Sequence, residues 1–149
     1  MSDIGPRETI FQGLETIMGD VEGQALVTRD LGILLSGQIT EHPAIFIVDL
    51  GDEVDDTDNY EDNRRTLRFA MVAVIEGSTR AAAPNEMAQF IWQIRKQLYE
   101  QILDCSEVDR FAETGMSHLS FSEVNSKEVH QGIQGEIKYI ENITNILSS

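Results

Sequence analysis

Acidic side chains are concentrated in one stretch, Gly51 to Asn63. Oxygen atoms at positions i and i+2, such as those of Asp56 and Asp58, are typical of calcium loops. The EF-hand pattern is excluded, because Tyr60 occupies the third ligand position and no glycine follows for the sharp turn. We therefore predict no metal and no cofactor. Unpaired carboxylates are costly to bury, so a solvated hairpin loop is expected instead. Its acidic residues are Asp52, Glu53, Asp55, Asp56, Asp58, Glu61 and Asp62.

Other residue types that could do chemistry are few and scattered. His42, His118 and His130 show no triad or metal spacing with Ser, Cys or acidic residues, so each is expected on the surface or in a loop. Glycine-rich phosphate loops are absent from the sequence. Cys105 is the only cysteine, which excludes a disulfide within the chain, and it is expected half-buried near a helix end. The sequence therefore predicts that the protein is not an enzyme.

Two apolar runs on either side of the acidic stretch predict a strand hairpin. The first, Pro43 to Leu50, is short and rich in β-branched and aromatic residues. The second, Arg64 to Glu76, alternates, with one face apolar along its whole length and the other apolar only beyond Ala70. The second run is therefore expected to be a central strand, covered on both sides over its far half.

Helical periodicity appears on both sides of this hairpin. Apolar residues recur every three to four positions from Pro6 to Val21 and again from Pro84 to Asp104, which predicts two amphipathic helices. The segment Gln24 to Ser36 fits neither period and is expected to be extended or irregular. A flank of the second helix carries Trp92, Arg95 and Tyr99. These residues either border the core or anchor a partner subunit, since Trp, Tyr and Arg concentrate in interface hot spots.

The last third of the chain is polar and less regular. Ser117 to Ser122 alternates and predicts a half-buried strand. Gly135 to Ile140 predicts a final strand, with a helix as the alternative, and Ile140 and Ile143 break the phase in a way that suggests a bulge or bend. The whole pattern predicts one α+β domain, residues 1–149, in which two amphipathic helices pack on a mostly antiparallel sheet.

Charge and hydropathy restrict the function classes. The formal net charge of −15 repels phosphate backbones, so specific nucleic-acid binding is not expected. No apolar run approaches the roughly 20 residues that a membrane helix needs. The first residues lack the charged-then-apolar pattern of a signal peptide, which predicts a protein made in the cytosol without contact with a membrane.

The order of these features resembles a known family. An apolar strand (His42 to Val48), a charged loop, a long strand (Arg65 to Ile75) and a helix (Met87 to Leu103) together resemble the tail terminator proteins of long-tailed phages. The resemblance lies in pattern and order, because this class of minor tail proteins has no catalytic signature. It implies a structural virion protein, assembled in the host cytoplasm, that forms a homo-hexameric ring on the tail tube and stops its polymerisation.

The partners implied by the resemblance are the tail tube protein on one side and the head–tail connector protein on the other. A head-closure or neck adaptor, or another tail completion protein, is the alternative and would share the ring-forming character. Two hypotheses from other classes are a non-viral acidic adaptor and an enzyme whose site the sequence does not reveal.

A closed ring requires two different surfaces on each subunit. The candidates are the base of the hairpin, with Arg64, Arg65 and Arg68, and the helix flank of Trp92, Arg95 and Tyr99. The acidic loop either lines the lumen, where it repels passing DNA, or contacts those arginines on a neighbouring subunit. A hairpin that is merely solvated is the third interpretation.

Overall fold

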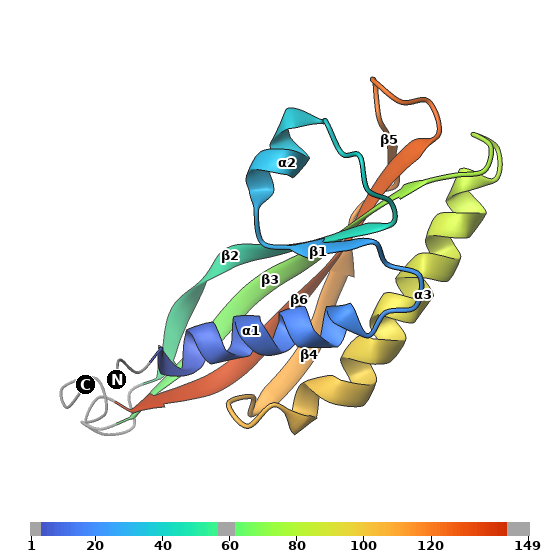
Figure 1. The fold of residues 1–149 in the computed structure, drawn as a ribbon. Helices are drawn as coiled ribbons and strands as arrows, with labels where there is room; N and C mark the ends of the chain where they lie inside the picture. Colours follow the sequence, from blue (N-terminus) through green and yellow to red (C-terminus); the bar gives the residue numbers. More distant parts are fainter. Residues whose placement is uncertain (1–3, 57–61, 143–149) are drawn as a thin grey trace.

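A six-stranded sheet runs through the molecule, with two long helices on one face (Figure 1). The computed structural model describes residues 4–56 and 62–142. The strand order is β1-β2-β3-β6-β4, with β5 also paired to β6, and every pair is antiparallel except β1 with β2. This confirms the predicted α+β class. In chain order the elements are α1 (Gly5–Gly19), β1 (Leu26–Thr28), α2 (Leu31–Ser36), β2 (Ala44–Asp56), β3 (Asp62–Glu76), α3 (Ala83–Gln101), a 3₁₀ turn (Ile102–Asp104), β4 (Arg110–Met116), β5 (Ser120–Phe121) and β6 (Glu128–Asn142).

The predicted central hairpin is present as β2 and β3. Strand β3 lies between β2 and β6 and, as its alternation predicted, buries one apolar set beneath α1 and α3. The second set is also buried at the far end, where Val74 lies in a smaller cluster with Ile39 and Phe46. Both predictions for this strand are therefore confirmed.

The prediction that Gly51 to Asn63 forms a solvated loop is wrong at both of its ends. Strand β2 continues to Asp56, and β3 begins at Asp62. Repulsion among the carboxylates is offset because Asp52, Glu53 and Asp55 each contact a cation of the same chain. Asp58 and Glu61 lie outside the described residues.

The segment Gln24 to Ser36 contains two short regular elements rather than one irregular stretch. Strand β1 adds to β2 in parallel, and α2 covers the end of the sheet that bears Val72 and Val74. The Asp30 side chain accepts a hydrogen bond from the Gly32 backbone N–H at the start of α2, and Gly37, at φ 71°, ends the helix in a left-handed conformation. These caps define a helix too short for periodicity to reveal.

The two predicted amphipathic helices are confirmed as α1 and α3. Pro6 and Pro84 lie in their first turns, where a missing backbone N–H has no cost. The apolar stripe of each helix is buried against the sheet. Cys105 lies half-buried directly after the 3₁₀ turn, as expected.

The C-terminal region differs most from expectation. The sequence did not predict β4, because Phe111 is its main apolar residue. The predicted strand from Ser117 to Ser122 shortens to β5, two residues long. Strand β6 is longer than predicted and pairs with β3 in unbroken register from Glu128 to Asn142, so the bulge expected near Ile140 is absent from the described part of the strand.

Candidate functional site

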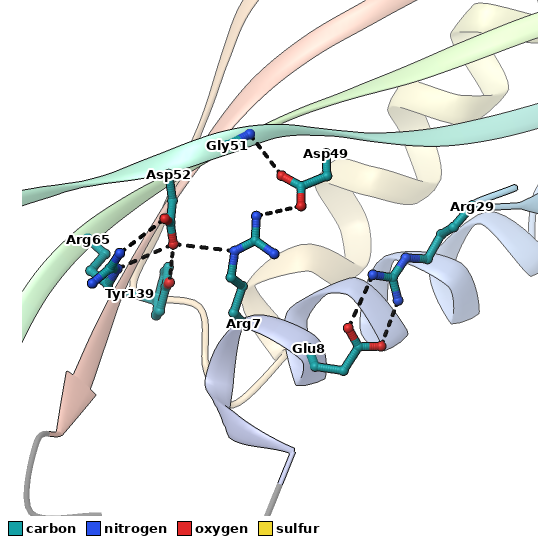
Figure 2. Close-up of polar contacts among 8 residues, drawn as sticks. All are labelled: Arg7, Glu8, Arg29, Asp49, Gly51, Asp52, Arg65 and Tyr139. Carbon is teal, nitrogen blue, oxygen red and sulfur yellow. Dashed lines mark hydrogen bonds and ion pairs between the residues drawn. The ribbon is translucent and has the colours of Figure 1, made fainter. Parts of the chain in front are cut away.

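Asp52 is the centre of a charged network between α1, β2, β3 and β6 (Figure 2). The Arg65 guanidinium donates to both of its carboxylate oxygens, at 3.1 and 3.3 Å. The Tyr139 hydroxyl donates to Oδ2 at 2.6 Å, and the Arg7 Nε lies 3.4 Å from the same oxygen. Arg7 also pairs with Asp49, so one residue of α1 bridges two carboxylates of β2. The network therefore fastens α1 to three strands.

A β-bulge places both of these carboxylates on the face that meets α1. The β2–β3 register shifts between Asp49, opposite Phe69, and Asp52, opposite Leu67. Three steps along β2 thus match two along β3, and the extra residue lets Asp49 and Asp52 point the same way. Gly51 lies in the bulge at φ 95°, a conformation that favours glycine. The Gly51 backbone N–H donates to Asp49 at 2.8 Å.

The contacts in this network change the acidity of its members. Burial alone would raise the pKa of Asp52, but hydrogen bonds from Arg65 and Tyr139 and attraction to the two arginines outweigh it and hold the pKa below its ordinary value. Burial first, and then its hydrogen bond to Asp52, raises the pKa of Tyr139. Hydrogen bonds from Thr66 and Lys138 lower the pKa of Asp55. The ionised carboxylates and the neutral tyrosine are therefore the forms that the fold favours.

Stability is expected to fall in acid for this reason. A carboxylate whose pKa is lower in the folded state contributes stability above its unfolded pKa, near 3.8, and loses that contribution as pH falls through the folded value. The free energy of unfolding, measured by urea titration, should hold steady from pH 7 to about 5 and decline below about 4. Asp52→Asn should flatten part of this decline. An unchanged pH profile in the variant would contradict the assigned role of Asp52.

The predicted arginines occupy two different faces of the sheet. Arg65 faces α1 and contacts Asp52 and Glu141, whereas Arg68 faces the other side and contacts Glu53 at 2.8 Å and Glu136 at 3.3 Å. Arg64 lines a cleft on that second side. The three arginines therefore do not form one surface.

The acidic residues that were grouped together in the sequence also separate. Asp52 faces α1, while Glu53 and Asp55 lie on the opposite face and pair with Arg68 and Lys138. Asp56 is the last residue of β2, and Asp62 is the first residue of β3. Asp49, Arg7 and Tyr139 were not among the predicted site residues. A glycine interrupting a strand pattern, as Gly51 does, was the signal that could have indicated the bulge.

The aromatic flank of α3, defined here as Trp92, Arg95 and Tyr99 of the helix together with Leu103 of the 3₁₀ turn that follows it, is largely exposed. Trp92 is 62% exposed, Tyr99 51% and Leu103 65%. Arg95 and the Tyr99 hydroxyl both contact Glu113 of β4 at 3.0 Å, and the Tyr99 ring packs edge-on against Phe111. These contacts fix the flank against β4. Trp92, beside Arg95, faces outward rather than bordering the core.

Two histidines flank a buried carboxylate. His42 lies in the loop before β2, as expected, whereas His130 lies within β6, so the expected loop position is wrong for it. Glu128, 2% exposed, accepts from His42 Nε2 at 2.7 Å and from His130 Nε2 at 2.8 Å. His42 precedes β2 and the other two residues begin β6, so the contact fastens both strand starts together. The sequence separation of His42 from Glu128 concealed this group. His118 is exposed, as expected.

Over residues 4–56 and 62–142, no group of three or more His, Cys, Asp or Glu side chains is arranged to hold a metal ion. Within the same ranges, no helix combines the length and apolar character needed to cross a bilayer. The charged and aromatic groups of this part of the molecule connect secondary structure elements to each other.

Comparison with solved structures gives several matching chains, among them one that is distant in sequence. No protein-family model and no curated protein sequence matches the chain. A chain in the structure titled "Virion of native gene transfer agent (GTA) particle" superposes with a TM-score of 0.31 at 8% sequence identity, covering 91% of this chain and 92% of that one. A TM-score this low does not establish a common fold.

Proposed function

We propose that the protein is a structural virion component, a tail terminator. Six copies form a ring on the tip of the finished tail tube and stop its polymerisation. The opposite side of the ring forms the joint to the head–tail connector protein. The ring assembles from subunits made in the host cytoplasm and needs no cofactor.

The observation that carries this proposal is the difference between the two open edges of the sheet. In the described part of the chain, the sheet ends at β1 on one side and at β4 on the other. Strand β1 has three residues and leads to α2, whereas β4 has seven residues (Figure 1). Leu35 of α2 is 83% exposed, and β4 contacts the aromatic flank through Phe111 and Glu113. A head-to-tail ring requires two such unlike surfaces.

Within this proposal the aromatic flank supplies the main lateral contact. Trp92 and Leu103 offer exposed apolar area, and large aromatic side chains dominate interface energetics. Arg95 and Tyr99 are held by Glu113, so the flank is ordered before a partner arrives. Arg64 and Arg68 lie on the sheet face away from α1 and α3. Arg65 lies on the α1 face, where it binds Asp52.

Two roles are open to the acidic residues in the ring. Glu53 and Asp55 would line the lumen and repel the DNA backbone, or would face a neighbouring subunit. Their contacts with Arg68 and Lys138 fit both roles, because an ion pair at the surface can exchange partners at little cost. Asp52 is assigned to the subunit's own stability.

Trp92→Ala is expected to weaken assembly on tube ends by about 2 kcal/mol per contact, roughly thirtyfold in half-saturating concentration. The thermal midpoint of the free protein should stay close to wild type, because Trp92 is already 62% exposed. Gln89→Ala, at an exposed position on the same helix, should leave both quantities unchanged. Lower thermal stability of Trp92→Ala without an assembly defect would show that Trp92 stabilises the subunit and is not an interface residue.

The proposed function is tested with tail tubes grown from the tail tube protein of the same phage. Adding the purified protein should cap tube ends and stop elongation, measured as tube length in negative-stain images. Unrestricted growth, with no protein at the ends, would overturn the proposal. Binding to the connector protein without capping would indicate the head-closure or neck adaptor role instead.

A further inference from the structure

A row of directly opposed residues crosses the sheet on the face away from α1 and α3. Lys138 of β6 lies between Thr66 of β3 and Arg110 of β4 in the strand register. Neighbouring strands are about 4.8 Å apart, so the lysine and Arg110 stand side by side on this face. A cleft of about 270 Å³ opens next to them. The cleft is lined by Asp55, Arg64, Asp109, Arg110, Lys138, Tyr139 and Ile140.

This cleft brings cationic side chains together on an otherwise acidic chain. Its lining includes three cationic side chains and two carboxylates. Lys138 contacts Asp55 at 3.0 Å, while the exposed Arg110 side chain makes no hydrogen bond or ion pair with the residues that the structure describes. A carboxylate entering from outside could reach Lys138 and Arg110 together. It would lie between an ammonium and a guanidinium group, both strong donors to carboxylate oxygens.

The carboxylates in and beside the cleft favour a single acidic side chain over a polyanion as its ligand. Asp55 and Asp109 form part of its wall, and Glu136 lines the smaller hollow next to it. A DNA backbone carries a charge about every 1.7 Å along its axis, so neighbouring phosphates would face these carboxylates. An isolated Asp or Glu on another protein surface avoids that repulsion.

The opposite side of the same molecule offers such side chains. Glu22, Asp30 and Glu41 are exposed and lie in the segments that connect α1, β1, α2 and β2. Asp30 also caps α2. Arg29, the only cation between Glu22 and Glu41, is already bound to Glu8 through both guanidinium nitrogens, at 2.6 and 3.1 Å (Figure 2). The β1 side is therefore acidic, and it complements the basic cleft beside β4.

We propose that the Arg110–Lys138 cleft binds a carboxylate of a second copy of this chain, supplied by the segment from Glu22 to Glu41. This inference rests on the proposed ring, since a head-to-tail contact brings the β1 side of one subunit to the β4 side of the next. The ion pairs set the register of the two subunits, while the aromatic flank supplies apolar area. Raised salt weakens the contact.

The test is zero-length carbodiimide crosslinking of Arg110→Lys, which keeps the positive charge and places a reactive amine in the cleft. A mixture of ¹⁴N- and ¹⁵N-labelled protein, free and bound to tube ends, distinguishes links between copies by mass spectrometry. We expect mixed-isotope links from the cleft to the Glu22–Glu41 segment, lost at high salt. Lys127, exposed and distant from the cleft, serves as the control amine and should not form them. Arg110→Glu should lower the association of copies at least tenfold.

Each contrary result has a defined meaning. If the protein caps tubes but gives no such mixed-isotope link on them, the proposed function stands and the cleft assignment fails. Links to other acidic segments, or association unchanged by Arg110→Glu, also overturn the assignment. If the variant loses binding to duplex DNA while the association of copies is unaffected, the cleft belongs to nucleic acid instead.

Discussion

Asp52→Ala is expected to lower the free energy of unfolding by about 3 kcal/mol, even though Asp52 lies in the most acidic part of the sequence. The side chain is 14% exposed and receives hydrogen bonds from Arg65 and from Tyr139, which is 1% exposed. Removing the carboxylate leaves a partly buried guanidinium and a buried hydroxyl without their shared acceptor. Urea titration at pH 7 measures the change.

Glu53→Ala is the matched control for this prediction. Glu53 is the next residue of β2 and also pairs with an arginine, but its side chain is 57% exposed and that of Arg68 is 50% exposed. Exposed pairs of this kind contribute about 0–1 kcal/mol. Equal losses in the two variants would show that Asp52 has no special role, and the account of the network would be wrong.

Gly135→Val should cost about 3 kcal/mol or more, the upper range for an overpacked core. Gly135 of β6 lies between two aromatic rings, and a Cβ atom there would be 2.9 Å from Phe69 Cζ and 3.0 Å from Phe111 Cε1. Phe69 is fully buried, and Phe111 packs against Tyr99, so displaced rings would disturb the contact between β4 and α3. Thermal unfolding reports the loss.

Gly115→Val is the control for Gly135→Val, because it shows whether any glycine-to-valine change in the sheet lowers thermal stability. Gly115 lies in β4, and a Cβ atom placed there meets nothing within 4 Å. The variant should therefore unfold near the wild-type midpoint. If Gly135→Val behaved like this control, the close packing of the two rings against β6 would be disproved. Tube-end binding measured in both variants would show whether disturbing β4 also weakens the proposed lateral contact.

The regular parts of the fold could be predicted because one physical signal dominates each. The period-two burial of β3 and the helical stripes of α1 and α3 come from apolar residues meeting one core, and local periodicity records this directly. Strand β4 escaped prediction because its position depends on pairing with β6, while its own sequence lacks an alternating apolar set. Such a strand is determined by its neighbour more than by its own residues.

The contacts of the candidate site were harder to predict from the sequence, because they join residues that are distant in the chain. Asp52 was expected to be solvated, and only the bulge at Gly51 turns it toward Arg7, Arg65 and Tyr139. The pairing of His42 with Glu128 spans the sheet in the same way. Spacing placed Trp92 on a flank of its helix but left open whether it borders the core, and the structure shows the side chain 62% exposed.

The proposed function is tested most directly by electron cryo-microscopy of the tails of the phage that, under this proposal, encodes the chain. The account predicts one ring of six copies at a single end of each finished tube, with the aromatic flank of α3 at the contact between neighbours. Copies distributed along the tube, copies confined to the head, or tails of normal length that contain none of the protein would contradict it.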